Sequence, residues 1–174
     1  MRKKQKVKGI KMEKLKDEIA SIFKEIKVNI AQDTKLIISA KKEQVLNLLR
    51  FLKDKGYNHL ALISCVDWIE EKEFELVYIL GSYLEKGGKG HIILKTRIHR
   101  KKPKFKTIIP IFENAEPYER EIHELFGVDF EGHPRLTHLF LERDYKIPPF
   151  RKDFDTREYV KEVFEKIPFV EDKK

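Results

Sequence analysis

Apolar residues recur along the chain at the spacing of two amphipathic helices. The first helix is predicted from Met12 onwards, with Lys and Glu on its other face. The second has apolar residues three and four apart and ends at Gly56, a residue that commonly follows the last helical turn. The two apolar faces consist of Leu15, Ile19, Ile22, Phe23 and Ile26 in the first helix, and Val45, Leu48, Leu49 and Leu52 in the second.

Short apolar runs between and after these helices predict strands. Two runs separate the helices, a buried strand follows them, and two longer strands are joined by a Gly-rich loop that indicates a hairpin. A last strand precedes a third helix. In chain order the predicted strands are Val28–Ala31, Leu36–Ser39, Leu60–Val66, Phe74–Gly81, His91–His99 and Phe105–Phe112.

The order of these elements indicates the fold class. Consecutive strands joined by short turns favour antiparallel pairing, and helices interrupt the strands only at intervals. We therefore expect an α+β fold, in which a single mixed, mainly antiparallel sheet carries helices largely on one face. An extended C-terminal tail follows the last helix of the sheet domain.

The third helix contains the most distinctive pattern of the chain. Pro117 suits its first turn, Asn114 is a plausible cap, and Gly127 stands where a left-handed residue commonly ends a helix. Its apolar face holds Tyr118, Ile122, Leu125 and Phe126, at helical spacing. Its other face is expected to meet water or a charged partner, because it carries Glu119, Arg120, Glu121, His123 and Glu124.

Two linked motifs resemble the family of the C subunit of NADH-quinone oxidoreductase. The first runs from Glu119-Arg120-Glu121 through Glu124 and Gly127 to His133-Pro134, and the second is Pro149-Phe150-Arg151-Lys152-Asp153-Phe154. The chain departs from the family where Arg135-Leu136-Thr137-His138 replaces Asp-Leu-Arg-Arg and where Tyr118 replaces a common Trp. These departures affect the contacts of that loop and leave the fold assignment intact.

The resemblance implies a role in respiratory complex I or its relatives, the membrane-bound hydrogenases and sulfane reductases. It implies a non-catalytic scaffold on the cytoplasmic side of the membrane. The implied neighbours are a hydrogenase-large-like subunit, that is, one similar to the large subunit of hydrogenases, and a small iron–sulfur subunit. A nickel–iron centre or iron–sulfur clusters would then lie on partner subunits, and none on this chain. The expected partner contacts are Glu119, Arg120, Glu121, Glu124, His133, Pro134 and residues Pro149, Phe150, Arg151, Lys152, Asp153 and Phe154.

Composition limits the other possible functions. The chain has 174 residues and one cysteine, so one domain of ordinary size is expected, without an internal disulfide or a self-contained iron–sulfur cluster. No apolar run reaches the ~18 residues of a membrane span. Neither a secretory signal nor a catalytic constellation is evident. The Lys-rich and Glu-rich composition favours a thermophilic source, and with it a hydrogenase or sulfane reductase complex over a quinone-reducing one.

The net charge of +8 is concentrated in two segments. Residues 1–11 and Lys95–Lys106 hold thirteen basic residues and no acid, and subtracting them from +8 leaves −5. A small nucleic-acid-binding protein is the alternative function, since a basic strand and loop can bind phosphates. The patch is rich in Lys and interleaves only Phe105, so the respiratory function is preferred and no nucleic-acid partner is expected.

The pattern divides the chain into three parts. Residues 1–11 are expected to be a basic flexible N-terminus, residues 12–146 the α+β domain, and residues 147–174 an extended tail. Pro148-Pro149 favours an extended backbone, and Asp155 with Glu158 predicts the cap of a short helix. The tail either docks on a partner or folds back over its own sheet, and we predict docking.

Three other groups of residues resemble known kinds of site only in part. Gly81 to Gly90 lacks the Gly-Lys-Ser/Thr of a phosphate-binding loop, so a hairpin turn is predicted. His123, His133 and His138 do not have the close sequence spacing typical of metal ligands, and no cysteine accompanies them, so no metal is expected. Cys65 lies within an apolar run with no neighbouring His, which indicates a buried structural thiol.

Overall fold

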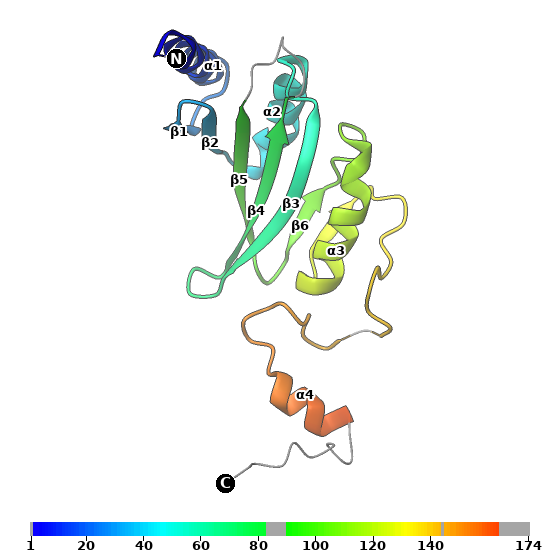
Figure 1. Cartoon of the computed structure of the whole chain (residues 1–174). Coiled ribbons are helices and arrows are strands. Elements are labelled where there is room, and N and C mark those ends of the chain that lie inside the picture. Colours follow the sequence, from blue (N-terminus) through cyan, green and yellow to red (C-terminus); the bar gives the residue numbers. More distant parts are fainter. Residues whose placement is uncertain (1, 83–89, 144, 164–174) are drawn as a thin grey trace.

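The computed structural model describes residues 2–82, 90–143 and 145–163. A five-stranded sheet forms its centre, with strands in the order β1-β2-β5-β4-β3 (Figure 1). All neighbours in this sheet are antiparallel except β2 and β5, which are parallel. The strands are β1 (Lys27–Gln32), β2 (Lys35–Ser39), β3 (His59–Trp68), β4 (Glu73–Gly81) and β5 (His91–His99).

Helices lie before, between and after the strands. They are α1 (Arg2–Ile22), α2 (Lys42–Asp54), α3 (Glu116–Phe126), which follows a 3₁₀ turn at Glu113–Ala115, and α4 (Thr156–Val163). The sequence predicted the start of α1 near Met12, and the structure extends it back to Arg2, through most of the basic segment 1–11. None of the helices in the described ranges is long and apolar enough to cross a membrane. The α+β fold class is confirmed.

One face of the sheet forms the core. Alternate side chains of β4, Phe74, Leu76, Tyr78 and Leu80, are fully buried on it. The predicted apolar residues of α2 are buried against the same core, and Figure 1 shows α2 behind the strands. The hairpin is also confirmed, because β4 and β5 pair from Gly81↔His91 to Glu73↔His99. Most of its Gly-rich loop lies outside the described residues.

Two strand predictions are corrected. Leu60–Val66 was predicted as a buried strand, yet β3 lies at the edge of the sheet and exposes the side chains of its outer face. Phe105–Phe112 was predicted as one strand, but only β6 (Lys104–Lys106) is extended, and it pairs in parallel with β7 (Asp129–Glu131).

The chain turns after β6 while its apolar side chains stay buried. The N–H groups of Ile111 and Phe112 donate to the carbonyl of Ile108 at 2.8 and 2.9 Å, and Pro110 has no N–H to give to a strand. Ile108, Ile111 and Phe112 are all buried. The prediction from this apolar run was therefore correct about burial and wrong about the extended conformation.

Candidate partner-docking site

The ends of α3 follow from its sequence, with one correction. Gly127 is left-handed at φ 75°, as predicted, and Pro117 lies in the first turn. Asn114 does not cap the helix, because it lies in the preceding 3₁₀ turn and its side chain donates to the Leu60 carbonyl at 2.8 Å. Tyr118 donates its hydroxyl to the Ala61 carbonyl at 3.1 Å. These two side chains join the start of α3 to the free edge of β3.

The charged face of α3 is largely buried, contrary to the sequence prediction. Glu119 is fully buried, and Arg120 and Glu124 are 9% and 6% exposed. The Glu119 carboxylate accepts hydrogen bonds from the Thr107 hydroxyl at 2.6 Å and the Ile108 N–H at 2.7 Å. Burial raises the pKa of Glu119 to about 7 in spite of these two donors. These carboxylates were expected to meet water or a partner, and instead they bind the chain's own loops.

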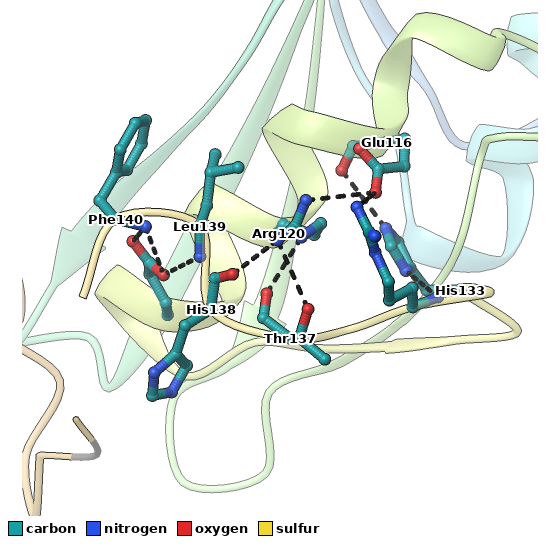
Figure 2. Close-up of polar contacts among 9 residues, drawn as sticks. Glu116, Arg120, His133, Thr137, His138, Leu139 and Phe140 are labelled. Atoms are coloured by element: carbon teal, nitrogen blue, oxygen red, sulfur yellow. Dashed lines mark hydrogen bonds and ion pairs between the residues drawn. The ribbon is translucent and has the colours of Figure 1, made fainter. Parts of the chain in front are cut away.

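Arg120 holds the segment that follows β7. Its guanidinium donates to the carbonyls of Thr137 at 3.0 Å and His138 at 2.5 Å, and it lies 3.5 Å from the Glu116 carboxylate (Figure 2). Among these acceptors only Glu116 is a carboxylate. The shortest hydrogen bonds of Arg120 therefore go to backbone carbonyls, and they hold residues 137 and 138 against α3.

Glu124 holds the next residues of the same segment. Its carboxylate accepts the backbone N–H groups of Leu139 and Phe140, the latter at 3.0 Å. Ionised side chains make the stronger hydrogen bonds to backbone, so Arg120 and Glu124 together fix residues 137–140 on α3. The Phe140 side chain is nevertheless 69% exposed, and Figure 2 shows its ring pointing away from the Arg120 contacts.

The histidines of this region each meet a different carbonyl. Ring nitrogens lie 2.8 Å from Val128 O for His123, 3.3 Å from Glu116 O for His133 and 3.2 Å from Leu141 O for His138. No group of three His, Cys, Asp or Glu side chains suited to a metal occurs in the described ranges. Glu121 is half-buried and Pro134 is exposed.

Residues 148–151 close the C-terminal end of α3. The Phe150 N–H donates to the Leu125 carbonyl at 3.0 Å, and Arg151 Nε donates to the Phe126 carbonyl at 2.7 Å. Helix ends leave such carbonyls unpaired, and a cation there also suits the helix dipole. The Arg151 guanidinium lies 5.2 Å from the centre of the Phe74 ring.

An ion-pair cluster attaches the following residues to the sheet. Arg100 pairs with Asp67 of β3 and with Asp153, and the Lys152 N–H donates to Asp67 at 2.9 Å. Burial opposes ionisation of Asp67, but the hydrogen bonds from Arg100 and Lys152 outweigh it and lower the pKa of Asp67. These contacts cross the boundary at residue 146 that the sequence predicted, and they join residues 148–154 to the α+β domain.

The start of α4 carries an aromatic cluster. Tyr145, Phe154 and Tyr159 lie with ring centres 4.9 to 5.9 Å apart. The Asp155 carboxylate accepts the N–H groups of Arg157 and Glu158 at 2.8 and 3.1 Å, so the predicted cap is confirmed for Asp155. Pro149 is half-buried.

Sequence reasoning missed three residues of this region. Asp67, Arg100 and Phe140 were not predicted as site residues. Asp67 and Arg100 attach the segment after α3 to the sheet, and Phe140 is the most exposed large apolar side chain of that segment. A charged Asp67 inside an apolar strand was the available signal, because a buried carboxylate needs a partner. The position of Phe140 gave no such signal.

Similarity to known proteins extends over the same motifs. Residues 38–160 match the family model described as the 30-kDa subunit of respiratory-chain NADH dehydrogenase. The chain belongs to this family. The match runs from Ile38 within β2 to Val160 within α4, and so includes every residue of the contacts just described from Asp67 to Tyr159.

Relatives in the 30-kDa subunit family are named as parts of different oxidoreductases. The C subunit of NADH-quinone oxidoreductase from Moorella thermoacetica is 32% identical, over 82% of this chain and 95% of that protein. The C subunit of F(420)H(2) dehydrogenase from Methanosarcina mazei is 34% identical, over 66% of this chain and 72% of that protein.

A solved structure extends the likeness to nearly the whole chain. A chain of the membrane-bound sulfane sulfur reductase, an archaeal respiratory membrane complex, matches with a TM-score of 0.81 at 31% identity. The match covers 94% of this chain and 97% of that one. The named relatives are thus subunits of multisubunit respiratory oxidoreductases.

Proposed function

We propose that this chain is a non-catalytic structural subunit of a complex I-like, membrane-associated respiratory oxidoreductase. It would hold a hydrogenase-large-like electron-transfer module on the cytoplasmic side of the membrane. The observation that carries this proposal is a set of exposed apolar side chains on a backbone segment that the protein fixes in place. We call residues 140–143 and 145–150 the docking segment.

The docking segment exposes three large apolar side chains. Phe140, Ile147 and Phe150 are 69%, 39% and 60% exposed. Aromatic side chains are enriched among the residues that dominate protein interfaces, because they bury a large area at a small cost in conformational entropy. Two exposed aromatic side chains and an exposed isoleucine within a short segment favour a protein partner over water.

The ends of the docking segment are held by the domain. Glu124 binds the backbone of Phe140 at one end, and the Phe150 N–H donates to Leu125 at the other. A segment whose ends are held before binding loses less conformational entropy when a partner arrives. The buried charges of α3 therefore support docking indirectly: they position the backbone that presents the apolar side chains.

The electron-carrying cofactors are proposed to lie on partner subunits. Cys65 is the only cysteine in the sequence, and burial raises its pKa to about 12, which disfavours the thiolate that a metal requires. A hydrogenase-large-like subunit and a small iron–sulfur subunit are the proposed partners. Membrane contact would then be indirect.

The nucleic-acid alternative has weaker support. Within the basic stretch Lys95–Lys106, Lys95 and Arg97 pair with Glu75, and Arg100 pairs with two aspartates. Lys104 also pairs, with Asp129. Cations that already have carboxylate partners attract phosphates less strongly, because each ion pair is close to neutral.

Purification of the native complex tests the proposal. The tagged full-length chain is expressed in its source cells, membranes are solubilised in mild detergent, and co-purifying proteins are identified by mass spectrometry. We expect a hydrogenase-large-like subunit in stoichiometric amount. Recovery of the chain without any oxidoreductase subunit would contradict the proposal, and recovery with nucleic acid would favour the alternative.

A further inference from the structure

β5 is longer than its neighbour β2 and so has an unpaired edge. β2 pairs with His91 to Lys95 and ends at Ser39, opposite Lys95. The Ala40 N–H still donates to Lys95 O at 3.0 Å, and the chain then turns away into α2. β5 continues through Thr96–His99, with β4 on one side. On the other side, no strand of the described chain pairs with these residues.

The direction of the free backbone groups follows from the alternation along a strand. The His91 N–H donates to Thr34 O at 2.8 Å on the β2 side, and Lys95 O accepts from Ala40 on that side. Successive residues of a strand point their N–H and C=O groups to opposite edges. The N–H and C=O groups of Arg97 and His99 therefore point into the space beyond Ser39.

That space is a groove of about 620 Å³ between the end of β2, the start of α2 and residues 96–99 of β5. Its lining has an excess of positive charge, with five cations against three carboxylates, and the positive end of α2 adds to this excess. The cations are Lys27, Lys41, Lys42, Lys95 and Arg97.

Elsewhere the sheet closes its edge with side chains. At β3 the carbonyls of Leu60 and Ala61 accept hydrogen bonds from Asn114 and Tyr118. Proteins commonly cover free strand edges in this way, because unpaired backbone groups are a template for another strand. The edge at Arg97 and His99 has a groove beside it instead.

We propose that an extended, acidic segment of a partner subunit pairs with Thr96–His99 and continues the line of β2 beyond Ser39. Main-chain hydrogen bonds to Arg97 and His99 would supply affinity, and Lys27 and Lys42 would select acidic side chains. This inference rests on the proposed function, which supplies the partner. It adds a second contact, at the free part of the β5 edge.

Hydrogen–deuterium exchange tests the pairing directly. The probes are the isolated full-length chain and the native complex purified with it, read by mass spectrometry over peptides that span residues 96–100. We expect the amides of Arg97 and His99 to exchange freely in the isolated chain and at least about tenfold more slowly in the complex. Slow exchange in the isolated chain would mean that the chain covers its own edge, and would overturn the inference.

Charge reversal tests the acidic character of the partner. Lys27→Glu with Lys42→Glu should remove most of the protection in the complex, while Lys102→Glu, outside the groove, should leave it unchanged. Equal protection in both variants would overturn an acidic partner. Fast exchange of these amides in a complex that still assembles would overturn the strand pairing and leave the proposed function standing. Failure of the tagged chain to recover any partner subunit would overturn the strand pairing and the proposed function together.

Discussion

The Arg100 guanidinium and the Asp67 carboxylate form a two-pronged pair, with Nε 2.8 Å from Oδ1 and Nη2 3.0 Å from Oδ2. The two side chains are 13% and 2% exposed, so water screens the pair weakly. The same carboxylate accepts the Lys152 N–H, and the same guanidinium binds Asp153. This pair is therefore where the sheet and the segment after α3 are joined.

Asp67→Asn should destabilise the protein by about 2 kcal/mol at pH 7, because it removes the more buried of the two carboxylates that pair with Arg100. Urea denaturation measures the change. Asp129→Asn is the matched control, since its partner Lys104 is 61% exposed, and a loss below about 0.5 kcal/mol is expected. Equal losses in the two variants would contradict this account of the cluster.

The Asp67 pair should also show in acid. Its pKa is lowered in the folded state from 3.8, so its stabilising contribution is present above that value and lost as pH falls through the lower folded value. The stability of the wild type should thus fall more steeply below about pH 4 than that of Asp67→Asn. Parallel curves of unfolding free energy against pH would show that Asp67 is not the group responsible.

Glu119 should have the opposite pH dependence. Its folded pKa of about 7 lies above the ordinary value of 4.5, so its contribution to stability is fully present below about pH 4.5 and is lost as pH rises through 7. Between pH 5 and 8 the wild type should lose about 2 kcal/mol relative to Glu119→Gln. The relevant measurement is the difference between the two proteins in the slope of unfolding free energy against pH. The free energy at a single pH is not suitable, because Glu119→Gln also removes one of the two hydrogen bonds that the side chain accepts. Identical slopes would contradict a raised pKa.

Truncation tests how far the folded unit extends. Removal of residues 147–174 deletes Arg151, Lys152 and Asp153, whose contacts close α3 and bind the Asp67–Arg100 pair. A loss of about 3 kcal/mol should lower the melting temperature by about 6–12 °C. Removal of residues 156–174 keeps these contacts and should change it by far less. If both truncations melt like the full chain, residues 148–154 do not belong to the domain.

Gly127 is a position where a side chain does not fit. Its φ is +75°, and an added Cβ would lie 2.9 Å from Arg151 Nη2 and 3.0 Å from Pro148 Cγ. Gly127→Ala should cost about 1–2 kcal/mol in unfolding free energy. Gly81→Ala is the control, because its nearest atom would be 3.7 Å away and its φ is not positive. A larger loss at Gly81 would count against the close packing at Gly127.

The sequence predicted those elements whose cause is local. α3 and its end at Gly127 were predicted because helical spacing and a left-handed glycine depend on neighbouring residues. The burial of Glu119 and Glu124 was missed, because their partners, Ile108 and Phe140, lie in other segments of the chain. The same holds for Asp67, whose partner Lys152 is 85 residues away. Helix periodicity shows which side chains share a face, and not what covers that face.

The most direct test of the central claim is assembly by the docking segment. Phe140→Ser with Phe150→Ser removes its two most exposed aromatic side chains, and interface anchors of this kind typically contribute about 2 kcal/mol each. Ile22→Ser is the control, because Ile22 is 54% exposed at the end of α1, outside the docking segment. Both variants should fold, as circular dichroism and thermal melting will check.

The measurement is the yield of the hydrogenase-large-like subunit that co-purifies with each tagged variant from membranes solubilised in mild detergent. The account predicts that the double Phe variant recovers less than about a tenth of the wild-type amount, and that Ile22→Ser recovers all of it. Wild-type recovery by a folded double Phe variant would contradict the claim that this segment holds the chain in its complex.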